Sequence, residues 1–345
     1  MASSAATPEQ PLLSVTNLKI RIQMDNGELK AVDGVDFEIR KGRTLGLVGE
    51  SGCGKSLTSR AIIAINPKEC ETTGEILYNA SSNTSNGPID LLKLDPRGKQ
   101  MRSIRGSKIA MIFQEPMTAF SPMYTIGNQI MEAVRIHRTK SKKEARQITL
   151  DMLGKVGISD QEKRFDQYPH EFSGGMRQRA MIAMALSCNP ELLIADEPTT
   201  ALDVTIQAQV LELMKGLQQE FGMAILLVTH DLGIIAEMCD EVAVMYLGKI
   251  VEQAPVKEIF RNPKHPYTKG LMRSMPRLGG NKSERLESIE GSVPLAVNMP
   301  PMCGFYDRCP NRIEGVCNAK AVPITRLSDQ HLVRCFLYTE QGEGE

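Results

Sequence analysis

The sequence lacks a net charge of either sign. Among its 345 residues, 41 are basic and 41 are acidic, so the formal net charge at pH 7 is zero. Proteins whose main partner is nucleic acid or an anionic membrane surface usually carry a basic patch or a basic excess. The balance gives no indication of such a partner, and we expect no nucleic acid among the ligands.

Long apolar segments are also absent. No apolar run approaches the roughly 18 residues needed to span a bilayer. Residues 1–11, MASSAATPEQP, lack the basic start and the apolar stretch of a signal peptide. We therefore expect residues 1–11 to be a short disordered tail, and the protein to be cytosolic. Cysteines in that compartment are usually reduced or bound to metal rather than paired in disulfides.

Strands and helices alternate along much of the chain. Alternating apolar residues predict strands within 15–22 and 35–39. Short apolar runs predict further strands at residues 44–49, 108–113, 191–198 and 223–231, helices at 56–65 and 232–240, and a hairpin at 242–253 that turns at Leu247–Gly248. This alternation implies an α/β core with a largely parallel sheet.

Two regions depart from the alternation. Between about residues 115 and 189 the pattern is helical, which predicts an inserted helical subdomain. After about residue 261, proline, glycine and cysteine become more frequent and the periodicity weakens. We therefore predict a main domain at 12–261 and a C-terminal domain at 262–345.

The segment GESGCGKS, residues 49–56, fits the phosphate-loop pattern G-x-x-x-x-G-K-[ST] at every fixed position. It follows a predicted strand and opens a predicted helix, as phosphate binding requires. The glycines let backbone N–H groups turn toward phosphate oxygens, Lys55 supplies a positive charge, and the Ser56 hydroxyl can bind Mg²⁺. The nucleotide-contacting residues predicted here are Gly49, Glu50, Ser51, Gly52, Cys53, Gly54, Lys55, Ser56 and Leu57.

In the segment LLIADEP, an acidic pair, Asp196 and Glu197, lies at the C-terminal end of an apolar strand. Ligands of open α/β sheets bind at the carboxyl ends of the strands. Next to a phosphate site, Asp196 can hold Mg²⁺ directly or through water. Glu197 can then orient and polarise the attacking water.

Four further fragments accompany the phosphate loop. They are FSGGMRQR with Ser173, Gly174 and Gly175, IFQEP with Gln114, TTALD with Asp203, and VTHD with His230. Together with the loop they resemble the signature, Q-loop, D-loop and H-loop of the ATP-binding cassette (ABC) ATPases. The resemblance covers residues 12–253 and implies an ABC-type P-loop ATPase core with an antiparallel β subdomain and an inserted helical subdomain.

The resemblance also implies roles for these residues. Two cassettes would sandwich two ATP molecules head to tail, and Ser173, Gly174 and Gly175 would contact the γ-phosphate held by the partner's loop. Asp203 would complete the ATP-contacting set. The catalytic residues implied are Glu197, His230 and Gln114, and the magnesium ligands implied are Ser56, Gln114 and Asp196. The family usually stacks an aromatic side chain on adenine, whereas this chain offers Ile22 beside Arg21.

A closer resemblance comes from residues 115–133 and 262–278, which look like the matching regions of oligopeptide and dipeptide (peptide/nickel) importer ATPases. It implies two transmembrane permease subunits, a second related ATPase subunit and a separate solute-binding protein. The protein would lie at the cytoplasmic face of the cell membrane as a peripheral subunit. Residues 115–124 would help to form the groove that holds a permease helix.

Four cysteines crowd the C-terminal region. Cys303, Cys309, Cys317 and Cys335 have the spacing C-x5-C-x7-C-x17-C, without the C-x2-C knuckles common in structural zinc sites. The compartment disfavours disulfides, and the density of the cysteines disfavours unrelated buried thiols. A four-thiolate site for Zn²⁺ or a cubane iron–sulfur cluster remains. The resemblance implies [4Fe–4S], which we prefer to zinc, in a cysteine-rich C-terminal extension.

The sequence therefore predicts an ATP-hydrolysing subunit that powers the import of di- or oligopeptides or similar solutes. Importers of this family that carry nickel or oligosaccharide are an alternative. A soluble non-transport ABC ATPase is another, although such proteins usually have tandem cassettes or a coiled-coil insert. A regulatory module with an inactive site is disfavoured because the phosphate machinery is intact.

Overall fold

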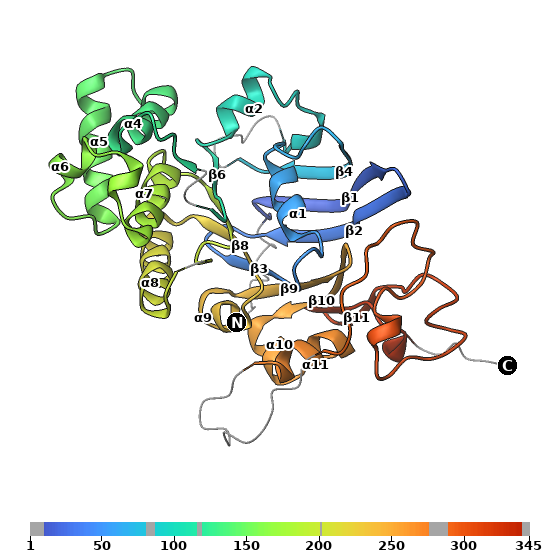
Figure 1. Ribbon diagram of the computed structural model, residues 1–345. Helices are drawn as coiled ribbons and strands as arrows, with labels where there is room; N and C mark the ends of the chain where they lie inside the picture. Colours follow the sequence, from blue (N-terminus) through green and yellow to red (C-terminus); the bar gives the residue numbers. More distant parts are fainter. Residues whose placement is uncertain (1–9, 81–86, 116–118, 201, 276–288, 340–345) are drawn as a thin grey trace, which may run out of the picture. The chain divides into compact units, whose positions relative to one another are not determined.

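A computed structural model describes residues 10–80, 87–115, 119–200, 202–275 and 289–339 (Figure 1). The predicted tail at 1–11 thus lies almost entirely outside the described residues. The chain divides into two compact units. Unit 1 comprises residues 1–13, 39–43 and 77–227, and unit 2 comprises residues 14–38, 44–76 and 228–345.

The sheet strands of unit 1 carry the predicted acidic pair. Strand β6 (Ile109–Ile112) pairs in parallel with β7 (Leu192–Asp196), and β8 (Ala224–Thr229) lies on the other side of β7. All five residues of β7 are buried, so its apolar run is covered on both faces. The short strand β5 (Ile89–Asp90) pairs antiparallel with the end of β4 (Cys70–Tyr78). Parallel pairing of β6 with β7 agrees with the predicted strand direction, but other strand pairs of the protein are antiparallel, so its sheets are mixed rather than largely parallel.

The helices of unit 1 gather mainly between residues 119 and 189, where the described residues contain no strand. They are α4 (Ile126–His137), α5 (Lys142–Lys155), α6 (Gln161–Phe165) and α7 (Gly174–Leu186), with the 3₁₀ turn η2 (Pro169–Glu171). Met131, Val134, Ala145, Leu150 and Phe165 form an apolar core shared by α4, α5 and α6. Among the described residues, the remaining helical elements of the unit are η1 (Leu91–Lys93), α2 (Lys99–Ile104) and α8 (Val204–Phe221), of which α2 and α8 are labelled in Figure 1.

The larger sheet of unit 2 has the strand order β11-β12-β10-β9-β3. Its strands are β3 (Thr44–Val48), β9 (Glu241–Tyr246), β10 (Lys249–Pro255), β11 (Thr325–Ser328) and β12 (His331–Val333). Strand β3 pairs in parallel with β9, and the other pairs are antiparallel. The predicted hairpin turn is confirmed: Leu247 and Gly248 have φ values of 45° and 77°, as a two-residue turn with two left-handed positions requires.

A second sheet and several short helices complete unit 2. The sheet has the order β2-β1-β4, with β1 at Leu13–Met24 and β2 at Gly27–Ile39. The helices are α1 (Lys55–Ile62), α9 (Leu232–Met238), α10 (Val256–Arg261), α11 (Pro266–Arg273), and the 3₁₀ turns η3 (Tyr306–Arg308) and η4 (Phe336–Tyr338).

The C-terminal region is built into the core of unit 2. Strand β12 pairs with β10, and Phe305 packs in one apolar cluster with Tyr246 and Tyr267. The buried carboxylate of Glu252 on β10 accepts hydrogen bonds from the backbone N–H groups of Lys264 and His265 at 2.7 and 2.9 Å. The weak periodicity after residue 261 did not indicate these strands, because β11 and β12 have only four and three residues.

The buried imidazole of His265 makes the stability of this region sensitive to pH. Its Nδ1 caps α11 by accepting a hydrogen bond from the backbone N–H of Tyr267 at 3.1 Å. Burial, aided by the charge of Lys269, lowers the pKa of His265 to about 3. The unfolded chain, with a histidine pKa near 6.5, therefore binds more protons than the folded chain between these values, and stability falls as pH falls through that window.

We expect the midpoint of urea unfolding to be lower at pH 5.5 than at pH 7.5. His265→Asn keeps a capping acceptor but cannot be protonated, so this variant should lose that part of the pH dependence. The exposed His170 provides a control, since His170→Asn should retain the wild-type pH dependence. An unchanged pH dependence in His265→Asn would contradict the assignment.

Candidate functional site

The predicted phosphate loop spans the turn between β3 and α1 in unit 2, as the sequence indicated. Gly52 and Gly54 have φ values of 80° and 101°, which side chains rarely adopt. A Cβ atom on Gly54 would lie 2.3 Å from the carbonyl oxygen of Ala31, and one on Gly49 would lie 2.1 Å from that of Met245. The loop conformation therefore depends on glycine at these positions.

Lys55, the first residue of α1, is buried, and its ammonium group lies inside the loop. Its Nζ donates to the carbonyl oxygens of Gly49 at 2.8 Å and Glu50 at 3.0 Å. Ser56 follows on the same helix. The neighbouring thiol of Cys53 is 1% exposed, and burial raises its pKa, so it stays protonated and contributes no charge. The loop thus presents a fixed cation and backbone amides, which suits a phosphate chain.

His230 also belongs to unit 2. It is exposed and directly follows the last residue of β8. The next residue, Asp231, caps α9 by accepting hydrogen bonds from the backbone N–H groups of Gly233 and Ile234 at 2.7 and 3.4 Å. This cap fixes the chain immediately after His230, so the imidazole is presented at a strand end.

The acidic pair and Gln114 come together in unit 1. Asp196 is the buried last residue of β7, and Glu197 has a left-handed φ of 47°. The carboxylate of Glu197 accepts hydrogen bonds from Nε2 of Gln114 at 2.8 Å and from the hydroxyl of Thr200 at 3.0 Å. Thr200 carried no signal in the sequence. These two hydrogen bonds fix the orientation of the Glu197 carboxylate.

Two residues of unit 1 that were predicted to contact ATP, Ser173 and Asp203, cap helices. Ser173 is the N-cap of α7, and its Oγ accepts a hydrogen bond from the backbone N–H of Met176 at 3.3 Å. Asp203 caps α8 in the same way through the backbone N–H of Ile206 at 3.0 Å. Ser173 and Gly174 are exposed, so the first turn of a thirteen-residue helix is open to an anion.

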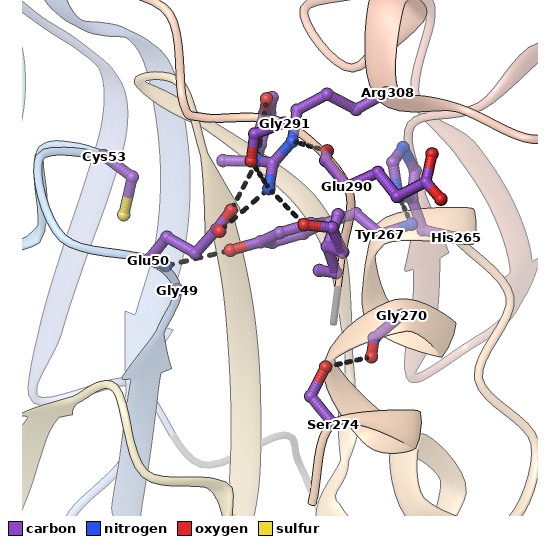
Figure 2. A network of polar contacts seen from close by, with 12 residues as sticks. Gly49, Glu50, Cys53, His265, Tyr267, Gly270, Ser274, Glu290, Gly291 and Arg308 are labelled. Atoms are coloured by element: carbon purple, nitrogen blue, oxygen red, sulfur yellow. Dashed lines mark hydrogen bonds and ion pairs between the residues drawn. The ribbon is translucent and has the colours of Figure 1, made fainter. Parts of the chain in front are cut away.

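Two residues that contact the phosphate loop were not predicted (Figure 2). The hydroxyl of Tyr267 accepts a hydrogen bond from the backbone N–H of Glu50 at 2.8 Å. The guanidinium of Arg308 binds both carboxylate oxygens of Glu50, at 2.7 and 3.0 Å. Both partners are more than 200 positions from the loop in sequence, so no local pattern could indicate them.

The four C-terminal cysteines lie in one part of unit 2. The backbone N–H of Cys303 donates to the carbonyl oxygen of Cys317 at 2.8 Å. Burial, followed by the charges of Cys317, Cys309 and Cys335, raises the pKa of Cys303 to about 12. Burial likewise raises the pKa of Cys335 to about 11. None of the four forms a disulfide.

The structure does not confirm a metal centre at these cysteines. Within the described ranges, no three histidine, cysteine or acidic side chains are arranged to hold a metal ion. Cys317 instead packs with Val322 and Phe336, and its sulfur accepts a hydrogen bond from the backbone N–H of Ile313 at 3.4 Å. The arrangement of the thiols therefore does not fit a bound cluster.

Comparison with known proteins supports the sequence resemblance. Residues 32–200 match the family described as ABC transporter. Residues 251–317 match the family described as oligopeptide/dipeptide transporter, C-terminal region. A putative peptide import ATP-binding protein of Brucella ovis is 49% identical over 338 residues, which cover 96% of this chain and 98% of that protein.

A second relative and a solved structure also support the resemblance to ATP-binding cassettes. The dipeptide transport ATP-binding protein DppD of Bacillus subtilis is 49% identical over 336 residues, covering 97% of each chain. Among solved structures, a dimeric ATP-binding cassette in a post-hydrolysis state bound to ADP and Pi superposes with a TM-score of 0.61 at 25% identity. That superposition covers 71% of this chain and 98% of the solved one.

Proposed function

The chain belongs to the ABC transporter ATP-binding proteins of the oligopeptide/dipeptide type, and from this membership we propose that it powers the import of peptides. The proposal is carried by the 49% sequence identity of this chain to ATP-binding proteins of peptide transport. That similarity extends over nearly the whole chain and includes the region after the cassette. The prediction of an ATPase is likewise confirmed by the family.

The proposal gives each polar residue of the site a role. Lys55 and the backbone amides of residues 49–57 hold the phosphates of ATP. Ser56, Gln114 and Asp196 offer hydroxyl, amide and carboxylate oxygens, which are the donors that Mg²⁺ prefers. Glu197 orients the attacking water, and His230 contacts the γ-phosphate. Magnesium would neutralise charge that develops on the phosphates during transfer.

A second cassette completes the site in this proposal. The open first turn of α7, with Ser173, Gly174 and Gly175, would contact the γ-phosphate of ATP bound to the partner ATPase subunit, and Asp203 would lie near that junction. Closure on ATP and reopening after hydrolysis would move the two permease subunits. A separate solute-binding protein would deliver the peptide.

The protein would act as a peripheral subunit at the cytoplasmic face of the cell membrane. Among the residues that the structure describes, no helix is both long and apolar enough to cross a bilayer. Part of the proposed permease groove, residues 119–124, is described, and Met123 and Tyr124 expose 76% and 62% of their surface. Exposed apolar side chains of this size suit contact with a permease helix.

Purification in detergent tests this function. The chain should co-purify with two polytopic membrane proteins and a second ATPase subunit. In proteoliposomes its ATPase activity should rise when a peptide-loaded solute-binding protein is added on the opposite side. The same assay with the binding protein incubated with nickel or with oligosaccharide distinguishes the alternatives. A rise in ATPase activity with one of these solutes, and not with peptide, would favour an importer of that solute. Isolation of the chain with soluble partners alone would favour the non-transport ABC ATPase.

From the cysteine spacing and the family resemblance, we also propose a C-terminal domain at 262–345 with a four-thiolate [4Fe–4S] centre, zinc being the alternative. Anaerobically purified protein should contain iron and absorb visible light. Cys309→Ser should lose both, whereas Cys239→Ser, which replaces a partly buried thiol outside the set, should lose neither. Protein with zinc and no iron would contradict the iron–sulfur assignment.

A further inference from the structure

The first residues of the phosphate loop are held from outside by the C-terminal region of unit 2 (Figure 2). Glu50 occupies a free position of the loop motif, so phosphate binding does not itself require its carboxylate. Nevertheless its backbone N–H is bonded to Tyr267 on α11, and its carboxylate is bonded at both oxygens to Arg308 in η3. Bidentate guanidinium–carboxylate pairs fix orientation as well as distance.

Arg308 is itself firmly fixed. Only 6% of its side chain is exposed, against 29% for that of Glu50. Its guanidinium donates to the carbonyl oxygens of Ile289, Glu290 and Gly291 at 3.4, 2.9 and 3.2 Å. It also donates to the hydroxyl of Tyr246 at 3.3 Å. A charged group this well bonded serves as an anchor rather than as a mobile surface cation.

Lys55, the lysine of the phosphate loop, is hydrogen-bonded to the same loop segment. Nζ of Lys55 donates to the carbonyl oxygens of Gly49 and Glu50, on the segment that Tyr267 and Arg308 hold. A shift of Glu50 would therefore displace the acceptors that position the Lys55 ammonium. Small displacements of a preorganised charge are costly for binding and for chemistry.

We propose that Arg308 and Tyr267 are positioning residues for the ATP site, which hold Glu50 and thereby keep the phosphate loop and Lys55 in the ATP-binding arrangement. The inference rests on the proposed function, since it takes the loop to be the ATP site. It assigns the C-terminal region a part in nucleotide binding. Because Arg308 precedes Cys309 directly, the conformation of the cysteine-bearing segment bears on the same contact.

Tyr267→Phe tests the first contact with little change in packing, because it removes only the hydroxyl. The variant leaves the N–H of Glu50 without its acceptor, and we expect the Kd for a fluorescent ATP analogue to rise by about 3- to 10-fold. Tyr338→Phe is the matched control. It also loses one tyrosine hydrogen bond in the C-terminal region, to the carbonyl oxygen of Lys264, but does not contact the loop.

Arg308→Gln tests the second contact and should raise the same Kd by about 10-fold or more, since a charged pair is lost. Arg334→Gln is its control, because Arg334 also donates to backbone carbonyl oxygens in this region, those of Ile250 and Val322. In a double-mutant cycle, Glu50→Gln should add little to the effect of Arg308→Gln on the Kd, because the two substitutions remove the same ion pair.

The inference is overturned if folded Tyr267→Phe and Arg308→Gln bind ATP as tightly as the wild-type chain. It is equally overturned if the two control variants lose as much affinity, because the effect would then be general destabilisation. Thermal unfolding of every variant establishes folding. A wild-type chain that fails to bind ATP would overturn the proposed function as well, whereas normal wild-type binding with unaffected variants overturns this inference alone.

Discussion

Glu197→Gln should leave ATP binding intact and slow ATP hydrolysis by a factor of about 100 to 10,000, the range for loss of a general base. Glutamine preserves the size of the side chain and can still accept the hydrogen bonds from Gln114 and Thr200 through its amide oxygen. It cannot accept a proton from water. Hydrolysis of radiolabelled ATP and binding of the fluorescent analogue measure the two effects separately.

Glu191→Gln is the matched control for this prediction. Glu191 immediately precedes β7, the strand that Glu197 follows, and its carboxylate pairs with Lys108 at 2.9 Å. Its replacement should change stability slightly and turnover hardly at all. Near-normal turnover of Glu197→Gln would refute the role assigned to Glu197.

Gly54→Ala should abolish most ATP binding. The residue has a φ of 101°, and its new methyl group would lie 2.3 Å from the carbonyl oxygen of Ala31, a backbone atom that cannot rotate away. The loop must then change its conformation and carry Lys55 with it. Since strained backbone alone costs about 1–3 kcal/mol, the Kd for ATP should rise by at least about 10-fold.

Gly52→Ala separates the effect of backbone strain from that of a steric clash with a neighbouring atom. Gly52 has a comparable φ of 80°, but a Cβ atom there would meet no atom within 4 Å apart from those of its chain neighbours. Its replacement should therefore weaken binding clearly less than Gly54→Ala does. Equal losses in the two variants, with both folded by circular dichroism, would contradict the proposed steric cause.

Local patterns were sufficient to predict the loop, the strands around it and the hairpin. The run TLGLVG followed by a glycine-rich turn predicts a strand, a loop and a helix, and the structure places β3, residues 49–54 and α1 there. Leu247 and Gly248 were likewise identified as a turn from the flanking apolar residues. These elements depend on neighbours in sequence, which periodicity and turn chemistry describe.

Contacts between distant segments were not predictable in this way. The pair of Glu50 with Arg308 joins residues 258 positions apart, and no periodic pattern relates them. The left-handed backbone conformation of Glu197 could not be predicted from the sequence either, because non-glycine residues rarely adopt it. Gln114 was assigned to magnesium by resemblance, and its hydrogen bond to the carboxylate of Glu197 could not be predicted from the sequence, because the two residues are 83 positions apart.

The pairing of β12 with β10 has a consequence for any shortened form of the protein. A fragment ending at residue 261 would retain every ATPase motif but lose β12, which covers one side of β10 through Glu252 and Gln253. Strand β10 would become an open edge with unpaired backbone groups and the apolar side chains of Ile250, Val251 and Ala254. An exposed strand edge can pair with strands of other molecules. The isolated cassette should therefore aggregate under conditions in which the full chain remains in solution.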